Sequence, residues 1–197
     1  LGHINHHRDE FGPKEPDFLL YSLYPITRAS MRRKITRDAG GVSAFRIVRP
    51  RFQRLGEARH RRLTYRFLLG QALIAGAFVL AGHPWLYLLL WVLPWAFAYQ
   101  VLNRLRAIAE HGGMTRSADR RRTSRHVHQT LLARLLIVPC SVGYHLAHHV
   151  DMTVPMWNLP RLHDALVGDG YVGDLEWPSY RALWRAQRSR PVEPAAA

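Results

Sequence analysis

The chain has 197 residues, a formal net charge of +14 and a hydrophobic share of 48%. That apolar share excludes an intrinsically disordered chain, which combines high charge with low hydrophobicity. The single cysteine, Cys140, excludes an internal disulfide, a cysteine-based zinc finger and an iron–sulfur cluster held by this chain alone. Twelve histidines are many for this length, and their uneven spacing makes metal binding the first function to consider.

The first histidine motif lies at the start of the chain, where His3, His6 and His7 follow the pattern HxxHH. In a helix, positions i, i+3 and i+4 share one face, so the three imidazoles can point in one direction. Imidazole nitrogens suit zinc, copper, iron or nickel. The motif therefore predicts ligands for a transition metal, with surface or core histidines as the alternative.

A basic segment and a long uncharged segment follow this motif. Residues 28–62 carry twelve arginines and lysines, whereas residues 67–103 contain no charged residue. A membrane-spanning helix needs about 20 apolar residues. The uncharged segment is interrupted by Gly82, His83 and Pro84, and it therefore predicts two short spans joined by a turn. Two buried helices of a soluble protein are the alternative, although such helices usually carry a polar face.

The charges that flank the predicted hairpin indicate its orientation. Residues 104–134 carry eight further arginines, and the turn carries none. Positively charged flanks stay in the cytoplasm. We therefore expect a cytoplasmic segment over 1–66, a transmembrane hairpin over 67–103 and a second cytoplasmic segment over 104–197. Because the basic residues flank the hairpin, they favour contact with lipid phosphates over binding to nucleic acid.

Four more histidines follow the hairpin. His145, His148 and His149 repeat the HxxHH pattern, and His111 follows Glu110 shortly after the second predicted span. A lone histidine near a membrane boundary is more often a hydrogen-bonded polar residue than a ligand, so spacing alone leaves the role of His111 open. An even number of spans returns the chain to the same side of the membrane, so all seven imidazoles can meet on the cytoplasmic face. Seven imidazoles exceed the need of one metal. The spacing thus predicts two metals and suggests a di-iron oxidase, while the ligand count alone leaves zinc open.

The remaining polar residues receive simpler interpretations. We expect His126 and His128 to be solvated loop residues and Cys140 to be a small buried residue. Ligating histidines usually donate their second N–H to a carboxylate, a carbonyl or water. Asp151, Asn158 and His163 are the candidates for such orienting contacts.

Three stretches resemble the membrane fatty acid desaturase and hydroxylase superfamily. The stretch from Gly143 to His149, followed by Val154 to His163, is similar to its third histidine box and the continuation of that box. The motif at His3 to His7, with Pro16 and Asp17 downstream, resembles the second box. The residues around His111 resemble the extra histidine after the last transmembrane helix.

The resemblance implies an all-α integral membrane bundle, in which a helical cytoplasmic cap carries the histidine boxes. Two iron ions would use dioxygen to introduce a double bond into a lipid acyl chain carried as acyl-lipid, acyl-CoA or acyl-ACP. An external ferredoxin, rubredoxin or cytochrome b5 would donate the electrons. The implied metal ligands are His3, His6, His7, His111, His145, His148 and His149.

Two departures from the family pattern qualify this resemblance. The first histidine box and the first hairpin are absent from these 197 residues, so we expect the chain to be the C-terminal part of a longer enzyme. Ala147 stands where many members have Glu or Gln. An acyl hydroxylase or ketolase on the same scaffold, and an inactive protein or one with a structural zinc, remain the alternatives.

Overall fold

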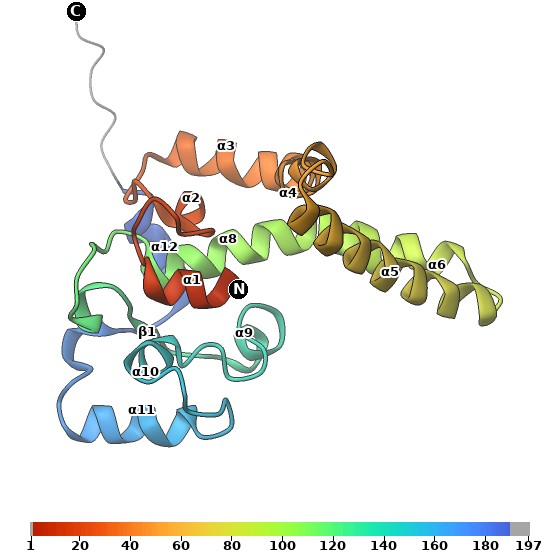
Figure 1. The fold of residues 1–197 in the computed structure, drawn as a ribbon. Helices are drawn as coiled ribbons and strands as arrows, with labels where there is room; N and C mark the ends of the chain where they lie inside the picture. Colours follow the sequence, from red (N-terminus) through yellow and green to blue (C-terminus); the bar gives the residue numbers. More distant parts are fainter. Residues whose placement is uncertain (1, 190–197) are drawn as a thin grey trace, which may run out of the picture. The chain divides into compact units, whose positions relative to one another are not determined.

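A computed structural model describes residues 2–189; residue 1 and residues 190–197, which belong to the two expected cytoplasmic segments, lie outside the described residues. The chain divides into two compact units. One unit comprises residues 32–101, and the other comprises the residues up to 31 together with those from 102 onwards. The described residues are mostly helical (Figure 1), as the sequence predicts.

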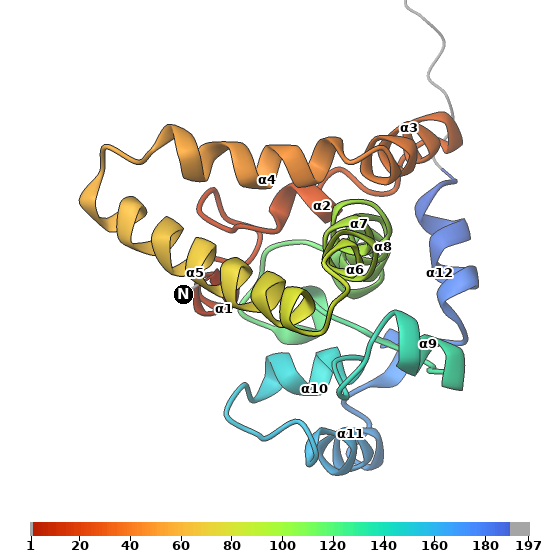
Figure 2. The ribbon, with the colours of Figure 1, turned by 90° about the vertical axis from the view of Figure 1, so that its right-hand side faces the viewer.

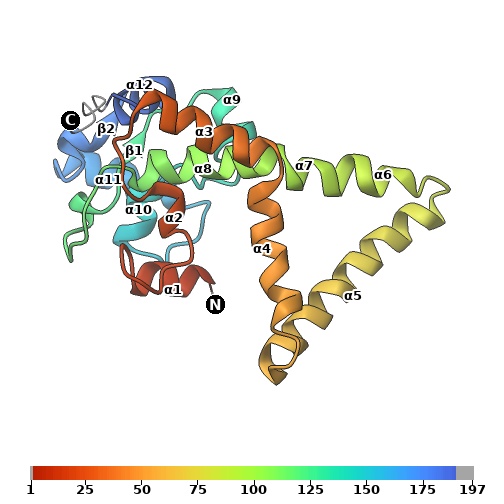
Figure 3. The same cartoon turned by 90° about the horizontal axis from the view of Figure 1, so that it is seen from above.

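The unit of residues 32–101 contains the apolar hairpin. Its elements are α4 (Val42–Gln53), α5 (Ala58–Leu80), α6 (Trp85–Tyr87), the π-helical turn η1 (Leu88–Val92) and α7 (Leu93–Ala96). Two further helices run from one unit into the other, α3 (Arg28–Ala39) and α8 (Ala98–His111). Figure 3 shows the short turn that joins α5 to α6. Gly82 enters this turn with a φ of 77°, which glycine adopts without strain.

Two helical stretches are long and apolar enough to cross a membrane. They are Ala58–Leu80, with 23 residues, and Trp85–His111, with 27, and each reaches a mean hydropathy of 1.5. Only 6% of each apolar window is buried, and the side chain of Leu80 is 91% exposed. A core helix of a soluble protein would be mostly covered, so these apolar faces need another apolar environment.

One polar side chain links the two stretches of the hairpin. The amide oxygen of Gln71 on α5 accepts hydrogen bonds from the Tyr87 hydroxyl and the Trp91 indole N–H, each at 3.0 Å. Helices surrounded by lipid gain little from the hydrophobic effect when they associate, and interhelical hydrogen bonds of this kind help to hold them together. Gln71 therefore has a structural explanation within the hairpin.

The other unit is built from short elements around the end of α8. They are α1 (Gly2–Arg8), α2 (Phe18–Tyr21), η2 (Arg120–Arg122), β1 (His126–Val127), α9 (Leu131–Leu136), α10 (His145–Val150), α11 (Leu159–Gly168), η3 (Gly173–Leu175), β2 (Glu176–Trp177) and α12 (Tyr180–Gln187). Helices α10 and α11 pack against each other (Figure 2). The short parallel pair β1–β2 is the exception to the all-α expectation.

A small core fixes α8 and α10 in this unit. Ile108 on α8, Leu146 on α10 and Leu183 on α12 are fully buried. The indole N–H of Trp184 donates to the carbonyl of Leu105 at 2.9 Å and so ties α12 to α8. The histidines that end α8 and line α10 are thus carried by packed helices.

Candidate metal centre

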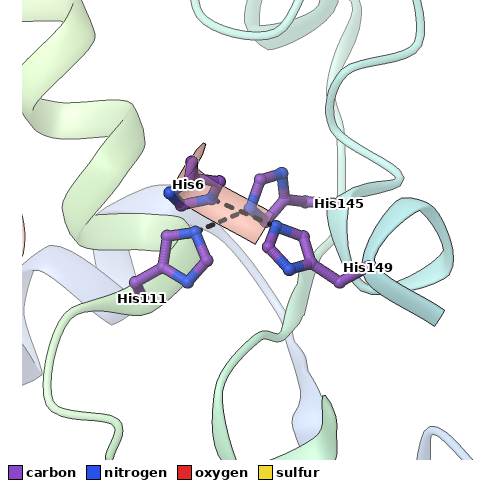
Figure 4. Close-up of side chains that lie close together, drawn as sticks. All are labelled: His6, His111, His145 and His149. Carbon is purple, nitrogen blue, oxygen red and sulfur yellow. Dashed lines mark hydrogen bonds between the residues drawn. The ribbon is translucent and has the colours of Figure 1, made fainter. Parts of the chain in front are cut away.

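Four buried imidazoles from three helices meet at one point in this unit. His6 comes from α1, His111 from the last residue of α8, and His145 and His149 from successive turns of α10. Figure 4 shows the four rings turned toward one another. The Nε2 atoms of His111 and His145 are 2.8 Å apart, and those of His6 and His149 are 3.4 Å apart. One nitrogen from each ring lies within 4.8 Å of those of the other three.

The remaining three predicted ligands form a second group beside the first. His148 Nε2 lies 2.9 Å from His7 Nε2 and 3.0 Å from His3 Nε2, and the last two atoms are 3.2 Å apart. The rings of His7 and His149 stand 4.3 Å apart, centroid to centroid. The seven predicted imidazoles are therefore partitioned as four plus three in adjacent groups.

The outer nitrogens of the four-imidazole group all face acceptors. His6 Nδ1 lies 2.5 Å from Glu15 Oε1, and His111 Nδ1 lies 2.8 Å from the carbonyl oxygen of Thr123. Longer contacts join His149 Nδ1 to Glu10 Oε1 at 3.3 Å and His145 Nδ1 to Glu110 Oε1 at 3.5 Å. These acceptors favour the tautomer with the proton on Nδ1, an assignment made from the contact network.

With that tautomer, four Nε2 lone pairs face one another at the centre of the group. Lone pairs at such short separations repel, and a cation placed among them would turn that repulsion into coordination. A carboxylate or carbonyl behind each ligating imidazole is the usual arrangement around protein-bound metals. The residues present thus fit a metal ion.

Glu15 orients His6 through a buried network. Its Oε1 contacts His6, while its Oε2 accepts from the backbone N–H of Phe11 at 2.5 Å and from the Tyr21 hydroxyl. Burial and the Glu15 carboxylate raise the pKa of Tyr21 well above its ordinary value. Burial alone would lower the pKa of His6, but the hydrogen bond with Glu15 raises it above the ordinary value.

The Glu10 carboxylate contacts two of the four imidazoles and the guanidinium group of Arg120. Its Oε1 lies 3.3 Å from both His111 Nδ1 and His149 Nδ1, and its Oε2 accepts from Arg120 at 2.6 Å. Burial opposes ionisation of the carboxyl group, but the flanking His111 and His149 hold its pKa well below the ordinary value. Glu10 is therefore a carboxylate that can anchor both rings.

Most of the imidazoles resist protonation. Burial, followed by the neighbouring His148 and His3, lowers the pKa of His7 to about 3. Burial likewise lowers the pKa values of His145 and His149 well below normal. Metal ligation requires neutral imidazole, so these rings are in the ligating form at neutral pH.

A cavity of about 270 Å³ opens beside the imidazoles. Its wall includes His3, His6, His111, His145 and His148. Its apolar lining comes from Leu20, Ala107, Val142, Met156 and Leu159, and its polar lining from Asp17, Asn103, Arg106 and Glu110. Cys140 also lines it and is exposed, which corrects the expectation of a buried residue. An apolar group in this cavity would lie against both imidazole groups.

The structure places the three predicted orienting residues away from this role. Asp151 is exposed and accepts from the backbone N–H and the hydroxyl of Thr153, at 2.9 and 2.6 Å. Asn158 makes no hydrogen bond to the seven imidazoles within residues 2–189; its backbone N–H donates to the carbonyl of Pro155 at 2.8 Å. His163 packs against His126, which is 4% exposed; the expectation that His126 is solvated is therefore wrong. His128 is exposed as expected.

The carboxylates that face the imidazoles are Glu10, Glu15 and Glu110, and the sequence reasoning did not assign them a role. Glu110 stands next to His111 in the chain, and Glu10 and Glu15 closely follow the first HxxHH motif. An acidic residue within a few positions of a histidine motif was the signal that could have pointed to them.

Comparison with known proteins agrees with these features. The fatty acid desaturase family matches residues 1–182. The chain is also 29% identical over 109 residues to the dihydrorhizobitoxine desaturase of Bradyrhizobium elkanii, in an alignment that covers 54% of this chain and 30% of that protein. The chain thus spans less than a third of the length of this relative. No solved structure is significantly similar to the chain. Because the family match covers nearly the whole chain, this protein belongs to the fatty acid desaturase family.

Proposed function

We propose that the chain is the catalytic part of a membrane fatty acyl desaturase that uses two irons and dioxygen. The observation that carries the proposal is the convergence of seven imidazoles into groups of four and three beside a partly apolar cavity. His6, His111, His145 and His149 would hold one iron, and His3, His7 and His148 the other. The three-imidazole group leaves coordination positions open, as a site that reacts with dioxygen requires.

The reaction removes two hydrogens from adjacent methylenes. One acyl –CH2–CH2– unit, one dioxygen, two electrons and two protons become –CH=CH– and two waters. The bound irons would supply the redox chemistry that activates dioxygen. The two electrons would come from an external ferredoxin, rubredoxin or cytochrome b5.

Side chains of this protein would position the acyl chain and the imidazole ligands. Leu20, Ala107 and Met156 offer the acyl chain an apolar wall, which excludes water around the reacting methylenes. Glu10 and Glu15 hold their imidazoles in one tautomer and one orientation. The carboxylates also supply negative charge near the metals, which seven neutral imidazoles lack.

The two apolar helical stretches, Ala58–Leu80 and Trp85–His111, would anchor the enzyme in the membrane that holds its substrate. Arginines precede and follow the hairpin, so the imidazoles would face the cytoplasm. Acyl chains carried by membrane lipid, acyl-CoA or acyl-ACP are all accessible from that side.

Product analysis tests the proposed reaction. The complete reading frame is expressed in a host that lacks acyl desaturases, with His145→Gln and His148→Gln variants as matched controls. We expect new monounsaturated acyl chains in the wild type, dependent on dioxygen and iron, and none in either variant. A hydroxylated or ketonic acyl chain without a new double bond would overturn the desaturase assignment in favour of the oxygen-inserting alternative.

The single cysteine provides a test of orientation. Cys140 is exposed and lines the cavity beside the imidazoles. A membrane-impermeant maleimide is expected to label the wild type in inside-out vesicles and not in right-side-out vesicles, because the cavity would face the cytoplasm. The Cys140→Ser variant shows how much labelling comes from other thiols. Labelling of Cys140 in right-side-out vesicles alone would place the cavity on the opposite side.

A further inference from the structure

A third cluster of side chains that could hold a metal ion lies apart from the seven imidazoles. It consists of His126 on β1, His163 on α11 and Glu176 on β2. One ligand atom from each of the three side chains lies within 4.8 Å of the other two. Nothing in the proposed desaturase reaction uses these residues.

Strand pairing and helix packing bring the three together. The parallel pair β1–β2 sets His126 opposite Glu176, and His126 Nε2 lies 3.9 Å from Glu176 Oε1. From α11, the ring of His163 lies 3.9 Å from that of His126, centroid to centroid. Tyr144 directly precedes α10. Its ring centroid lies 5.6 Å from that of His126 and 5.4 Å from that of His163.

The polar atoms of the cluster are incompletely satisfied. His126 and His163 are 4% and 7% exposed. Their Nδ1 atoms are buried and make no hydrogen bond of normal geometry with the described residues. Buried ring nitrogens almost always have a partner, so two such atoms in contacting residues call for an explanation.

The charge of the cluster suits a divalent cation. Burial, followed by the neighbouring His163 and His128, lowers the pKa of His126 to about 3. Burial also lowers the pKa of His163, although Glu176 and Asp164 oppose that shift. Both rings are therefore neutral ligands at pH 7. The side chain of Glu176 is 42% exposed, which leaves one side of the cluster open to water.

We propose that His126, His163 and Glu176 form a mononuclear Zn²⁺ site, with water in the remaining position. Two imidazoles and one carboxylate with an open position are a common ligand set for zinc. The site would join residue 126, which precedes α10, to residues 163 and 176, which follow it. Zinc would therefore clamp the segments on both sides of the helix that carries His145 and His149, whether or not that helix serves a desaturase.

Zinc counting tests the site. The full protein, purified in detergent and stripped of metal, is dialysed against buffered free Zn²⁺, and bound zinc is measured by mass spectrometry. The seven imidazoles can also bind zinc, but they are the same in every variant compared. We expect Glu176→Gln to bind one zinc fewer per chain than the wild type, and His163→Gln to do the same.

Matched controls separate this site from a general loss of metal. Asp174→Asn removes a neighbouring exposed carboxylate, and His128→Gln removes a neighbouring exposed imidazole; both are expected to retain the wild-type count. Glu176 is exposed, so its replacement should leave the helical content unchanged even if the His163 variant misfolds. Equal zinc counts in the wild type and Glu176→Gln would overturn the proposal and leave the cluster as a packed aromatic contact.

Discussion

If the proposed two-iron assignment is right, replacement of His111 by glutamine reduces bound iron from two ions per chain to about one and abolishes formation of the proposed unsaturated product. His111 is 2% exposed, and its Nε2 lies 2.8 Å from that of His145. Glutamine would present an amide in place of the ring nitrogen that faces the four-imidazole group, and it would lose the contact of Nδ1 with the Thr123 carbonyl. Iron per chain and product yield are measured on the same purified protein.

The partition into two groups makes this expectation specific. His7→Gln removes a member of the three-imidazole group, so it should also leave about one iron per chain, and the double variant should leave almost none. His128→Gln, at an exposed position outside both groups, is the control and should keep both irons. Two irons in the His111 variant, with its helical content intact, would show that His111 is not a ligand.

Six of the seven imidazoles could be selected from the sequence because their spacing is local, whereas His111 was identified as a ligand only through the family resemblance. Each HxxHH motif lies on one short helix, where positions i, i+3 and i+4 share a face whatever the tertiary structure. The division of the imidazoles into groups of four and three could not be predicted from spacing. His148 joins His3 and His7 while its neighbours His145 and His149 join His6, and only the packing of α1 against α10 and the end of α8 decides this.

The hairpin could be predicted from composition, but its helix boundaries could not. The absence of charge marks residues 67–103, whereas the helices run from Ala58 to Leu80 and from Trp85 to His111. Arginines continue a helix well, and no glycine or proline separates them from the apolar stretch on α5. The uncharged segment therefore underestimates the length of both helices.

The β1–β2 pair explains why the burial of His126 was not predicted. Each strand has only two residues, too few to show alternation in the sequence, yet their pairing buries His126. Asp151 illustrates the opposite case. It stands two residues before Thr153, and an aspartate commonly bonds to the backbone two residues on. This local signal favours the observed turn over an orienting contact with a distant imidazole.

Among residues outside the proposed ligand set, replacement of Glu10 should have the largest effect on iron binding. Glu10→Gln is expected to weaken iron binding by about 10- to 100-fold, the usual consequence of losing a partner behind a ligating histidine. Its carboxylate contacts His111 and His149 together and is held in place by Arg120. An amide has a single acceptor oxygen and no charge, so it cannot favour the Nδ1–H tautomer in both rings while accepting from arginine.

The variants around Glu10 distinguish orientation of the rings from simple loss of packing. Glu10→Asp keeps the charge and should restore part of the iron affinity, whereas Arg120→Gln should weaken binding less than Glu10→Gln because both rings retain their carboxylate. Asp9→Asn changes the adjacent acidic residue, which pairs with the exposed Arg116, and should leave iron affinity unchanged. Iron affinity is measured by competition with a chelator at fixed pH. Equal affinities for the wild type and Glu10→Gln would show that the carboxylate does not hold the two imidazoles for the metal, and the four-ring group would then depend on packing alone.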